Sequence, residues 1–519
     1  MKIYHKCILL ICIFFHVKYV SAQNEDITIQ NILTKYQFKD KYYTNILNNV
    51  YQKIGYQLIW FNNNNIIDII KEINLQSDAL GLNKEDYKVA VYNENKMRSF
   101  NTKLDSINAE INFTYTLIIF MHHYNFGNTV PKFGYNGLNI NINAAILITN
   151  KLIDLIKNNK LVFSNLLLYK NSLPEVYALE NMIKELVVLN TNKPNGNYHI
   201  NSSKISYKNA PLINKLSQLG ILDTLKENVS DSILKQKISL AQNLFNLQEE
   251  PKISDRLKAE LNIDILERIK RLKVSLNYYK WLYWKLINSN EPVILVNIPN
   301  AYMKVYNKNN IILEMKMVLG KYSTKTPTLT SRVNNVVLYP YWHVPYSIAT
   351  KELLPKIKRN ISYLNSGNYQ VINSSGKIIN PYTINWQALG KNYFPYTIRQ
   401  STGCDNSLGL IKLDFENPFG VYLHDTPSKL YFEQNKRFYS HGCMRMEKPT
   451  EIGKIILGSN HLAIDTLIEK GCLLNKSPIW VNAEIKSPLI VWYNLAGIDK
   501  FGKVVFYENI YKMKINENK

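Results

Sequence analysis

The sequence predicts a multidomain α+β protein, in which helical domains precede a β-rich domain in the C-terminal part of the chain. Apolar residues recur at helical spacing over residues 26–189, and a polar, turn-rich segment follows at 190–210. From Pro292 the apolar period changes from 3.6 to 2, which is typical of strands. With 519 residues, 46% of them hydrophobic, the chain can build the cores of about three domains.

The first 22 residues have the composition of a secretory signal peptide. Lys2 and Lys6 precede a mostly apolar stretch at 7–17, and the VSA sequence at 20–22 supplies the small residues that a signal peptidase requires. We expect cleavage before Gln23 and export to the periplasm. An uncleaved anchor is the alternative, although the apolar stretch is short for a bilayer.

The helical part is predicted to contain two domains and a connecting helix. Residues 23–206 form a helical N-terminal domain, 207–262 form a smaller helical domain, and 263–291 form an amphipathic connecting helix. Four-residue spacing in the first domain is carried by Ile46, Val50, Ile54 and Leu58.

Residues 292–512 are predicted to form the β-rich domain. The strand YMKVY and the alternating apolar residues of 311–319 flank a polar turn at 307–310, which predicts an antiparallel hairpin. Between about 346 and 400 the alternation gives way to a helix-like segment and an Asn-rich stretch. We interpret this stretch as an insertion in the β domain.

The net charge of +23 comes from 63 Lys and Arg against 40 Asp and Glu. A basic surface attracts nucleic acid, but only 9 of the 63 basic residues are Arg, and the wealth of Lys, Asn, Ile and Tyr is typical of AT-rich coding sequence. We therefore predict no nucleic-acid partner. To the extent that the positive charge has a function, we expect it to attract the protein to a polyanionic cell wall or a membrane surface.

The segment YSHGCMR at 439–445 carries the clearest chemical information. Cys443 follows Gly442, whose missing side chain lets the backbone approach a substrate carbonyl, as a nucleophile beside an oxyanion-binding turn requires. A thiol needs a base to become reactive, and His424 at the end of the strand-like segment VYLH is the candidate. The alternative is a buried structural cysteine with a histidine that is hydrogen-bonded in the core.

This arrangement resembles the YkuD-type L,D-transpeptidases, whose signature is a His followed at a fixed spacing by Ser/Thr-His-Gly-Cys. Here 15 residues separate His424 from Ser440. The similarity covers about residues 211–512 and is closest to the large periplasmic subclass, through segments such as VNIPNAYMKVY and GLIKLDFENPFGVYLHDTPSK.

The resemblance implies a cysteine transferase that forms 3-3 crosslinks in peptidoglycan. Cys443 would attack the carbonyl of the L-centre to D-Ala bond of a tetrapeptide stem, and His424 would activate the thiol, held by a carbonyl near Asp425. Backbone N–H groups of His441, Gly442 and Cys443 would form the oxyanion hole. The amine of a neighbouring diaminopimelate would then attack the thioester and form the crosslink. The resemblance thus implies a role in cell-wall biogenesis and in maintaining cell shape.

The resemblance also suggests substrate-binding residues. Arg445 would either bind a substrate carboxylate or support its loop with an ion pair. Tyr422 and Trp342 would line the groove or be core aromatics, and Ser440 belongs to the same candidate set. The insertion would be a lid over the active site.

The expected partners are peptidoglycan stem peptides, with carbapenem-type β-lactams as inhibitors. The smaller helical domain resembles a peptidoglycan-binding domain, although 252–254 (KIS) replace its usual glycine-containing turn. We expect no cofactor and no metal, because no HExxH or paired CxxC occurs and His122 and His123 should point to different helix faces.

Three functional alternatives and one question of pairing remain open from the sequence. The same acyl-enzyme could pass its acyl group to water, as an L,D-carboxypeptidase, or to a lipoprotein lysine, and a catalytically idle wall-binding protein is the third alternative. After signal cleavage three cysteines remain, so at least one thiol is unpaired. We expect Cys404 and Cys472 to be buried free thiols, with a disulfide between them as the alternative.

Overall fold

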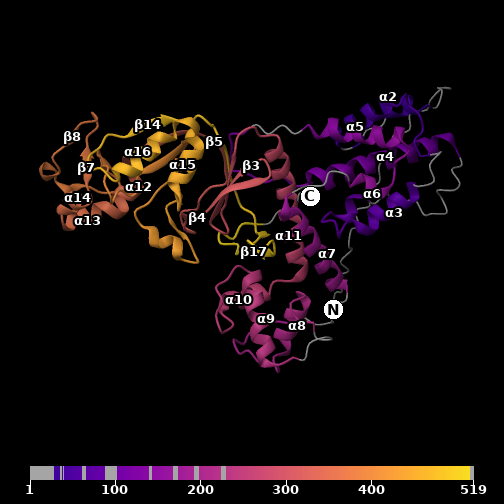
Figure 1. The fold of residues 1–519 in the computed structure, drawn as a ribbon, viewed down its shortest axis with the longest axis horizontal. Helices are drawn as coiled ribbons and strands as arrows, with labels where there is room; N and C mark the ends of the chain where they lie inside the picture. Colours follow the sequence, from indigo (N-terminus) through magenta and orange to yellow (C-terminus); the bar gives the residue numbers. More distant parts are fainter. Residues whose placement is uncertain are drawn as a thin grey trace, which may run out of the picture.

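The structure, a computed structural model, describes residues 28–35, 38, 40–60, 66–87, 102–138, 143–167, 173–191, 198–223 and 229–514. The predicted signal peptide lies outside the described residues. Helices occupy the N-terminal half and strands dominate the C-terminal half, so the predicted α+β fold class is confirmed. Figure 1 shows the first helices at one end of the molecule, the insertion at the opposite end and the main β region between them.

The first group of helices shares one hydrophobic core. Side-chain caps fix where its helices begin: the Asp40 carboxylate accepts the N–H of Tyr42, and Thr102 accepts that of Asp105. The elements of this region are α1 (Ile29–Lys35), α2 (Lys41–Lys53), α3 (Ile66–Gln76), η1 (Lys84–Tyr87), α4 (Lys103–Phe126), α5 (Ala144–Lys157) and α6 (Phe163–Leu166). Among the described residues no helix is long and apolar enough to cross a membrane.

A second group of helices packs around the long helix α11. Its core takes Leu272 and Leu276 from α11, while Trp284, near the other end of α11, belongs to the core of the first group. Trp284 also donates its indole N–H to the carbonyl of Asn125 at 2.8 Å. The group comprises α7 (Pro174–Thr191), α8 (Ala210–Gln218), α9 (Asp231–Leu244), α10 (Asp255–Leu261) and α11 (Ile265–Ile287). Helix α7 thus shares its core with α11, although the sequence analysis grouped it with the helices before it.

The strands of the β domain close on themselves. Their order is β5-β10-β11-β13-β4-β3-β2-β15, and β15 pairs again with β5. The strands of this path are β2 (Val293–Asn297), β3 (Tyr302–Asn307), β4 (Asn310–Gly320), β5 (Leu329–Leu338), β10 (Ile411–Phe415), β11 (Leu423–His424), β13 (Met444–Met446) and β15 (Pro488–Trp492). Strands β12 (Phe438–Ser440) and β14 (Ile479–Asn482) pair at its side, β16 (Ala496–Ile498) pairs with β17 (Val504–Phe506), and α15 (Pro449–Leu457), η6 (Gly458–His461) and α16 (Leu462–Lys470) follow β13.

A short strand from the N-terminal half joins this sheet, and the sequence analysis did not predict it. Strand β1 (Tyr135–Asn136) runs parallel to β5, with Gly134 and Gly137 donating to the carbonyls of Thr328 and Thr330 at 2.9 and 2.8 Å. A Cβ atom on Gly137 would lie 2.9 Å from the carbonyl oxygen of Thr330. The absence of a side chain therefore permits this contact between the two halves of the chain.

The insertion forms a small subdomain with its own core and a four-stranded sheet in the order β6-β9-β7-β8. It leaves the main sheet at β6 and returns through β9, and the two strands pair antiparallel. Its elements are β6 (Trp342–His343), α12 (Tyr346–Ile348), the π-helix η2 (Ala349–Leu353), α13 (Leu354–Arg359), α14 (Ser362–Ser366), β7 (Tyr369–Ile372), β8 (Ile378–Ile379), η3 (Pro381–Thr383), η4 (Trp386–Ala388) and β9 (Thr397–Gln400).

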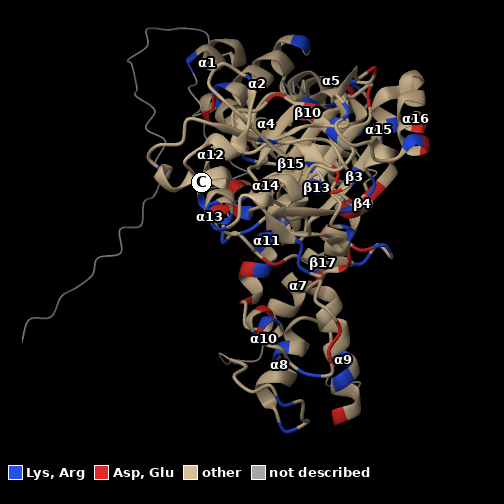
Figure 2. Ribbon diagram, turned by 90° about the vertical axis from the view of Figure 1, so that its left-hand side faces the viewer, with Lys and Arg blue, Asp and Glu red and all other residues tan. Residues whose placement is uncertain are grey.

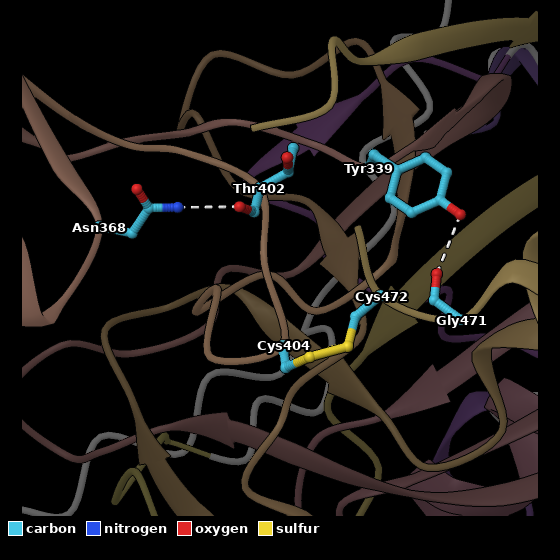
Figure 3. The surroundings of a disulfide bond; sticks show 6 residues. All are labelled: Tyr339, Asn368, Thr402, Cys404, Gly471 and Cys472. Carbon is cyan, nitrogen blue, oxygen red and sulfur yellow. Dashed lines mark hydrogen bonds between the residues drawn. A yellow bond between two sulfur atoms is a disulfide. The ribbon is translucent and has the colours of Figure 1, made fainter. Parts of the chain in front are cut away.

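A disulfide joins Cys404 to Cys472, so the expectation of two buried free thiols is wrong. Their Cα atoms are 5.1 Å apart although 68 positions separate them in the chain. Figure 3 shows the two loops at this point, where Thr402 accepts a hydrogen bond from Asn368 at 2.9 Å and Gly471 accepts one from Tyr339 at 2.9 Å. The bond ties the end of the insertion to the loop that follows α16.

Candidate active site

Two adjacent parallel strands place the predicted nucleophile and base on one face. In the register of β11 and β13, Leu423 lies opposite Met444 and His424 lies opposite Arg445. Leu423 and Met444 are completely buried in the core. Because side chains alternate along a strand, His424 and Cys443 both lie on the other face, as diagonal neighbours.

A network of hydroxyl groups holds the turn that carries Cys443. The hydroxyl of Ser440 donates to the carbonyl of Cys443 at 2.6 Å and accepts the N–H of Gly442 at 3.1 Å. Thr326 donates its hydroxyl to the carbonyl of Gly442 at 2.9 Å, and Gly442 has φ +117°, a conformation that favours glycine. Ser440 is only 2% exposed. Ser440 thus supports the turn, and its predicted substrate-binding role stays a prediction.

The same turn offers backbone donors. Since the N–H of Gly442 is bonded to Ser440, it is not available to a substrate. The N–H groups of His441 and Cys443 have no acceptor within the part of the chain that the structure describes. Two of the three predicted oxyanion donors are therefore free to bind a substrate oxygen.

His424 is buried, at 4% exposure, and held by a backbone carbonyl. Its Nδ1 lies 2.5 Å from the carbonyl oxygen of Asp425, so Nδ1 carries the hydrogen and Nε2 keeps its lone pair. The predicted contact near Asp425 is confirmed. His424 is thus arranged to accept a proton at Nε2.

The Asp425 side chain fixes the position of that carbonyl. Its carboxylate accepts hydrogen bonds from the backbone of Leu410 at 2.9 Å and of Thr426 at 2.7 Å, and from Lys429 Nζ at 2.5 Å. A Cβ on Gly409, which has φ +60°, would clash with this carboxylate. Sequence reasoning considered the backbone of Asp425 and missed the role of its side chain.

Tyr422 lies beside the thiol, and Trp342 lies on the far side of Tyr422. The Tyr422 hydroxyl lies near both the thiol of Cys443 and the indole of Trp342, which packs against the core of the insertion. The Tyr422 ring lies edge-on to His424 with centroids 5.6 Å apart. On the neighbouring strand Lys412, the cross-strand partner of His424, places its Nζ 4.7 Å from the Tyr422 ring centroid. Sequence reasoning missed Lys412, because its nearness depends on the pairing of β10 with β11.

Comparisons with known proteins assign the region that contains this site to a family. Residues 291–458 match the YkuD family, described as the L,D-transpeptidase catalytic domain. This region of the chain is an L,D-transpeptidase catalytic domain. Residues 45–166, in the first helical group, match the Scaffold domain family.

A curated relative from Haemophilus influenzae, named "Putative L,D-transpeptidase", is 34% identical over 220 residues. The match covers 42% of this chain and 44% of that relative, less than half of either protein. A solved L,D-transpeptidase from Mycobacterium smegmatis shares 14% identity, with 39% of this chain and 58% of that one covered and a TM-score of 0.18. Another, solved in complex with imipenem, shares 15% identity over 38% of this chain and 58% of its own, with a TM-score of 0.17.

In the L,D-transpeptidase domain, burial keeps the Cys443 and His424 pair uncharged. Burial, and then the charge of Arg445, lowers the pKa of His424 to about 3. Burial also raises the pKa of Cys443, while hydrogen bonds from Tyr422 and the charges of Lys412 and Arg445 act in the opposite direction. A thiol beside a neutral imidazole is therefore the resting state at neutral pH.

Arg445 lies on the same face, and no carboxylate among the described residues pairs with it. Its Nε is buried and has no hydrogen-bond acceptor among the described residues, and its guanidinium carbon lies 5.7 Å from the Tyr431 ring centroid. Burial lowers its pKa. Of the two roles considered from the sequence, the ion pair that supports the loop is not formed within the described part of the chain. A guanidinium whose buried Nε has no acceptor favours binding of an anion.

The insertion reaches the same turn. Nε2 of His441 lies 2.7 Å from Oε1 of Glu352 on η2, so this subdomain touches the residue beside the nucleophile. The sequence predicted a lid, but it did not predict this contact. Among the described residues no group of three or more potential ligands could hold a metal ion.

Proposed function

We propose that this protein is a cysteine L,D-transpeptidase that forms 3-3 crosslinks between peptidoglycan stems through a thioester. The observation that carries the proposal is the shared face of β11 and β13, where His424, fixed with its lone pair on Nε2, is the diagonal neighbour of Cys443. Acyl transfer through a thiol needs this pairing of nucleophile and base.

In the first step Cys443 takes the acyl group of the donor stem. The sulfur bonds to the carbonyl carbon of the L-centre to D-Ala bond while the thiol proton passes to Nε2 of His424. The N–H groups of His441 and Cys443 bind the oxygen that becomes negative. The C–N bond then breaks, and His424 returns the proton to the amine of the departing D-Ala.

In the second step an amine of a neighbouring stem attacks the thioester. Its nitrogen bonds to the carbonyl carbon, its proton passes to His424, and the C–S bond breaks. The proton returns to the sulfur, which restores the resting thiol. The Tyr422 hydroxyl and the positive charge of Lys412 stabilise the sulfur when it carries negative charge, since both act to lower the pKa of Cys443.

Recognition of the donor follows from the charge of the face. Stem peptides carry carboxylates, and Arg445 offers a partly buried guanidinium whose Nε is unpaired among the described residues. We assign Arg445 to a stem carboxylate. Trp342 and Tyr422 position the thiol, and the lid keeps water from the thioester.

We also propose export to the periplasm. The N-terminal Lys residues, apolar stretch and VSA sequence support it, and so does the disulfide Cys404–Cys472, because disulfides persist in oxidising compartments. Proteolytic mapping of the mature N-terminus from a periplasmic fraction tests this proposal, with Gln23 as the expected first residue.

Carbapenem-type β-lactams are proposed inhibitors, because their strained carbonyl can accept the same sulfur. Cys443 is the free cysteine of the described chain, so peptide mapping after treatment should place the adduct there. An adduct on a peptide that contains Cys404 or Cys472 would contradict the assignment of the nucleophile.

The deciding experiment is mass spectrometry of the products from purified disaccharide-tetrapeptide in H₂¹⁸O. We expect a dimer that has lost one D-Ala and contains no ¹⁸O. A tripeptide with ¹⁸O would identify an L,D-carboxypeptidase, and no product beyond that of Cys443→Ala would indicate an idle wall-binding protein. Adding a lipoprotein with a free lysine to the same reaction tests the remaining acceptor.

A further inference from the structure

The lid carries almost exclusively positive charge. Residues 346–400 contain seven Lys and Arg and a single acidic residue, Glu352. Figure 2 shows the basic residues around α13. The Glu352 carboxylate has several Lys and Arg residues nearby in the sequence of the lid. It nevertheless pairs with His441, which belongs to the turn at 440–443, here called the catalytic turn.

The lid's own fold sets the position of this carboxylate. Glu352 lies on the π-helix η2, and its neighbours Ala349 and Leu353 are buried in the core of the lid. The carboxylate is 46% exposed and the His441 side chain 34% exposed, and their atoms approach to 2.7 Å. The contact therefore crosses from one packed unit to another rather than lying within a single loop.

The other end of the lid is fixed to the main sheet. Trp342 pairs with Gln400 where the insertion leaves and returns, and the disulfide at Cys404 follows directly. The indole of Trp342 also lies near the Tyr422 hydroxyl, which is beside the thiol. The lid thus touches the active site at its base and again at Glu352, and only the second contact joins two exposed side chains that can separate.

The contact also determines which nitrogen of His441 is protonated. A carboxylate accepts hydrogen bonds, so Nε2 of His441 carries the hydrogen that it donates to Glu352. His424 is protonated on its other nitrogen, Nδ1. The two histidines of the site are therefore held in opposite orientations by two different acceptors.

We propose that Glu352 is a positioning residue, which holds the lid closed on the catalytic turn and orients His441 by accepting its Nε2–H. This inference rests on the proposed transpeptidase function, since the benefit of a closed lid is the alignment of two flexible stems. Glu352 itself does not touch the reacting atoms.

A double-mutant cycle on the full chain tests the proposal. Glu352→Ala should lower kcat/KM for the tetrapeptide donor by about tenfold, as loss of a partly exposed charge-assisted hydrogen bond would. The same substitution made in His441→Ala should have almost no further effect. Glu352→Gln, whose amide oxygen can still accept the Nε2–H, should recover most of the loss.

Three controls separate positioning from general damage. Lys351→Ala changes the exposed neighbour on the same helix and should leave kcat/KM within about twofold. Alkylation of Cys443 by iodoacetamide, which needs no lid, should be unchanged in Glu352→Ala. Hydrogen exchange in 346–359 should be faster in Glu352→Ala than in Lys351→Ala.

Additive effects of Glu352→Ala and His441→Ala, or equal losses in Glu352→Ala and Lys351→Ala, would overturn the proposal. A wild-type protein without transferase activity would refute the proposed function but still permit a decision here. In that case ¹⁵N NMR of His441 should show a proton on Nε2 that exchanges faster in Glu352→Ala. An unchanged His441 spectrum would refute the positioning role on its own.

Discussion

His424 on β11 and His123 on α4 have similar electrostatics and different surroundings. Burial lowers the pKa of each to about 3, and Nδ1 of each has an oxygen partner: the Asp425 carbonyl at 2.5 Å for His424 and the Tyr87 hydroxyl at 2.7 Å for His123. His424 shares its sheet face with a free thiol, whereas no cysteine occurs between residues 23 and 403. A strongly shifted pKa therefore identifies burial, and only the neighbouring nucleophile distinguishes an active site from a structural cluster.

The helical cluster, which consists of His122 and His123 on α4 with Tyr43 and Tyr87, extends this contrast. His122 contacts Tyr43 at 3.1 Å through Nδ1, and its ring centroid lies 6.0 Å from that of His123. Each histidine thus hydrogen-bonds to a different tyrosine. These polar contacts connect α4 to α2 and to η1, so they serve the packing of the first helical group.

The largest expected effect lies at the nucleophile. Cys443→Ala should reduce crosslinking by about 10⁴-fold or more, and Cys443→Ser should fail almost as completely because a hydroxyl is far harder to deprotonate. Product formation by mass spectrometry measures this, with circular dichroism to establish that the variants fold. Near wild-type turnover in either variant would show that Cys443 is not the nucleophile. His424 would then differ from the histidines of the helical cluster in no functional respect.

The second prediction compares the two histidines directly. His424→Ala should slow acylation by about 10² to 10⁴-fold, as loss of a general base does. His123→Ala should change acylation by less than about threefold, because its ring lies beside Tyr87 in the helical region. Single-turnover acylation by a carbapenem measures both. Equal decreases in the acylation rate of the two variants would mean that His123 affects the active site by stabilising the overall structure.

The sequence predicted the parts of the site that lie close together in the chain. The HGC turn and His424 are recognisable because their spacing in the chain is short. Asp425, whose carbonyl holds His424, is the residue that follows it directly. Lys412 was missed because its place depends on strand pairing, and Glu352 because 89 positions separate it from His441. Contacts of this kind are decided by the register of the sheet and the docking of the lid.

The fold was predictable to a similar degree. The change of apolar period located the boundary between helices and strands, but it could not show that α7 packs on α11 or that β1 joins the sheet of the catalytic domain. The disulfide depends on two loops that hydrogen bonds hold side by side, with Thr402 donating to the carbonyl of Lys476 at 3.0 Å. No local pattern in the sequence encodes such long-range packing.

The third prediction extends the contrast between functional and structural groups to two arginines. Arg437 donates to four backbone carbonyls, whereas Nε of Arg445 has no acceptor among the described residues. Arg445→Gln should raise KM for the tetrapeptide by about tenfold with little change in the melting temperature. Arg437→Gln should lower the melting temperature, because buried carbonyls lose their donors. Steady-state kinetics and thermal denaturation of the two variants measure the difference.

The fourth prediction concerns stability in acid and involves no change in activity. The folded pKa of His123, about 3, lies below the value of about 6.5 expected in the unfolded chain, so the unfolded state binds more protons between these values. Stability from the neutral imidazole is complete above pH 6.5 and is lost as the pH falls toward 3. Lowering the pH from 7 to 5 should cost about 2 kcal/mol for this residue.

His123→Gln should remove that part of the acid sensitivity, measured as the difference in urea unfolding between pH 7 and pH 5. Burial raises the pKa of Glu110 in the same helix, which adds stability in acid and partly offsets the histidine in the wild type. Because Glu110 is present in both proteins, the difference between them isolates His123. His199→Gln, a change at an exposed histidine outside this core, serves as the control and should leave the acid sensitivity unaltered. An equal change in both variants would mean that the α4 histidine is not held neutral by burial, and the electrostatic likeness to His424 would then fail.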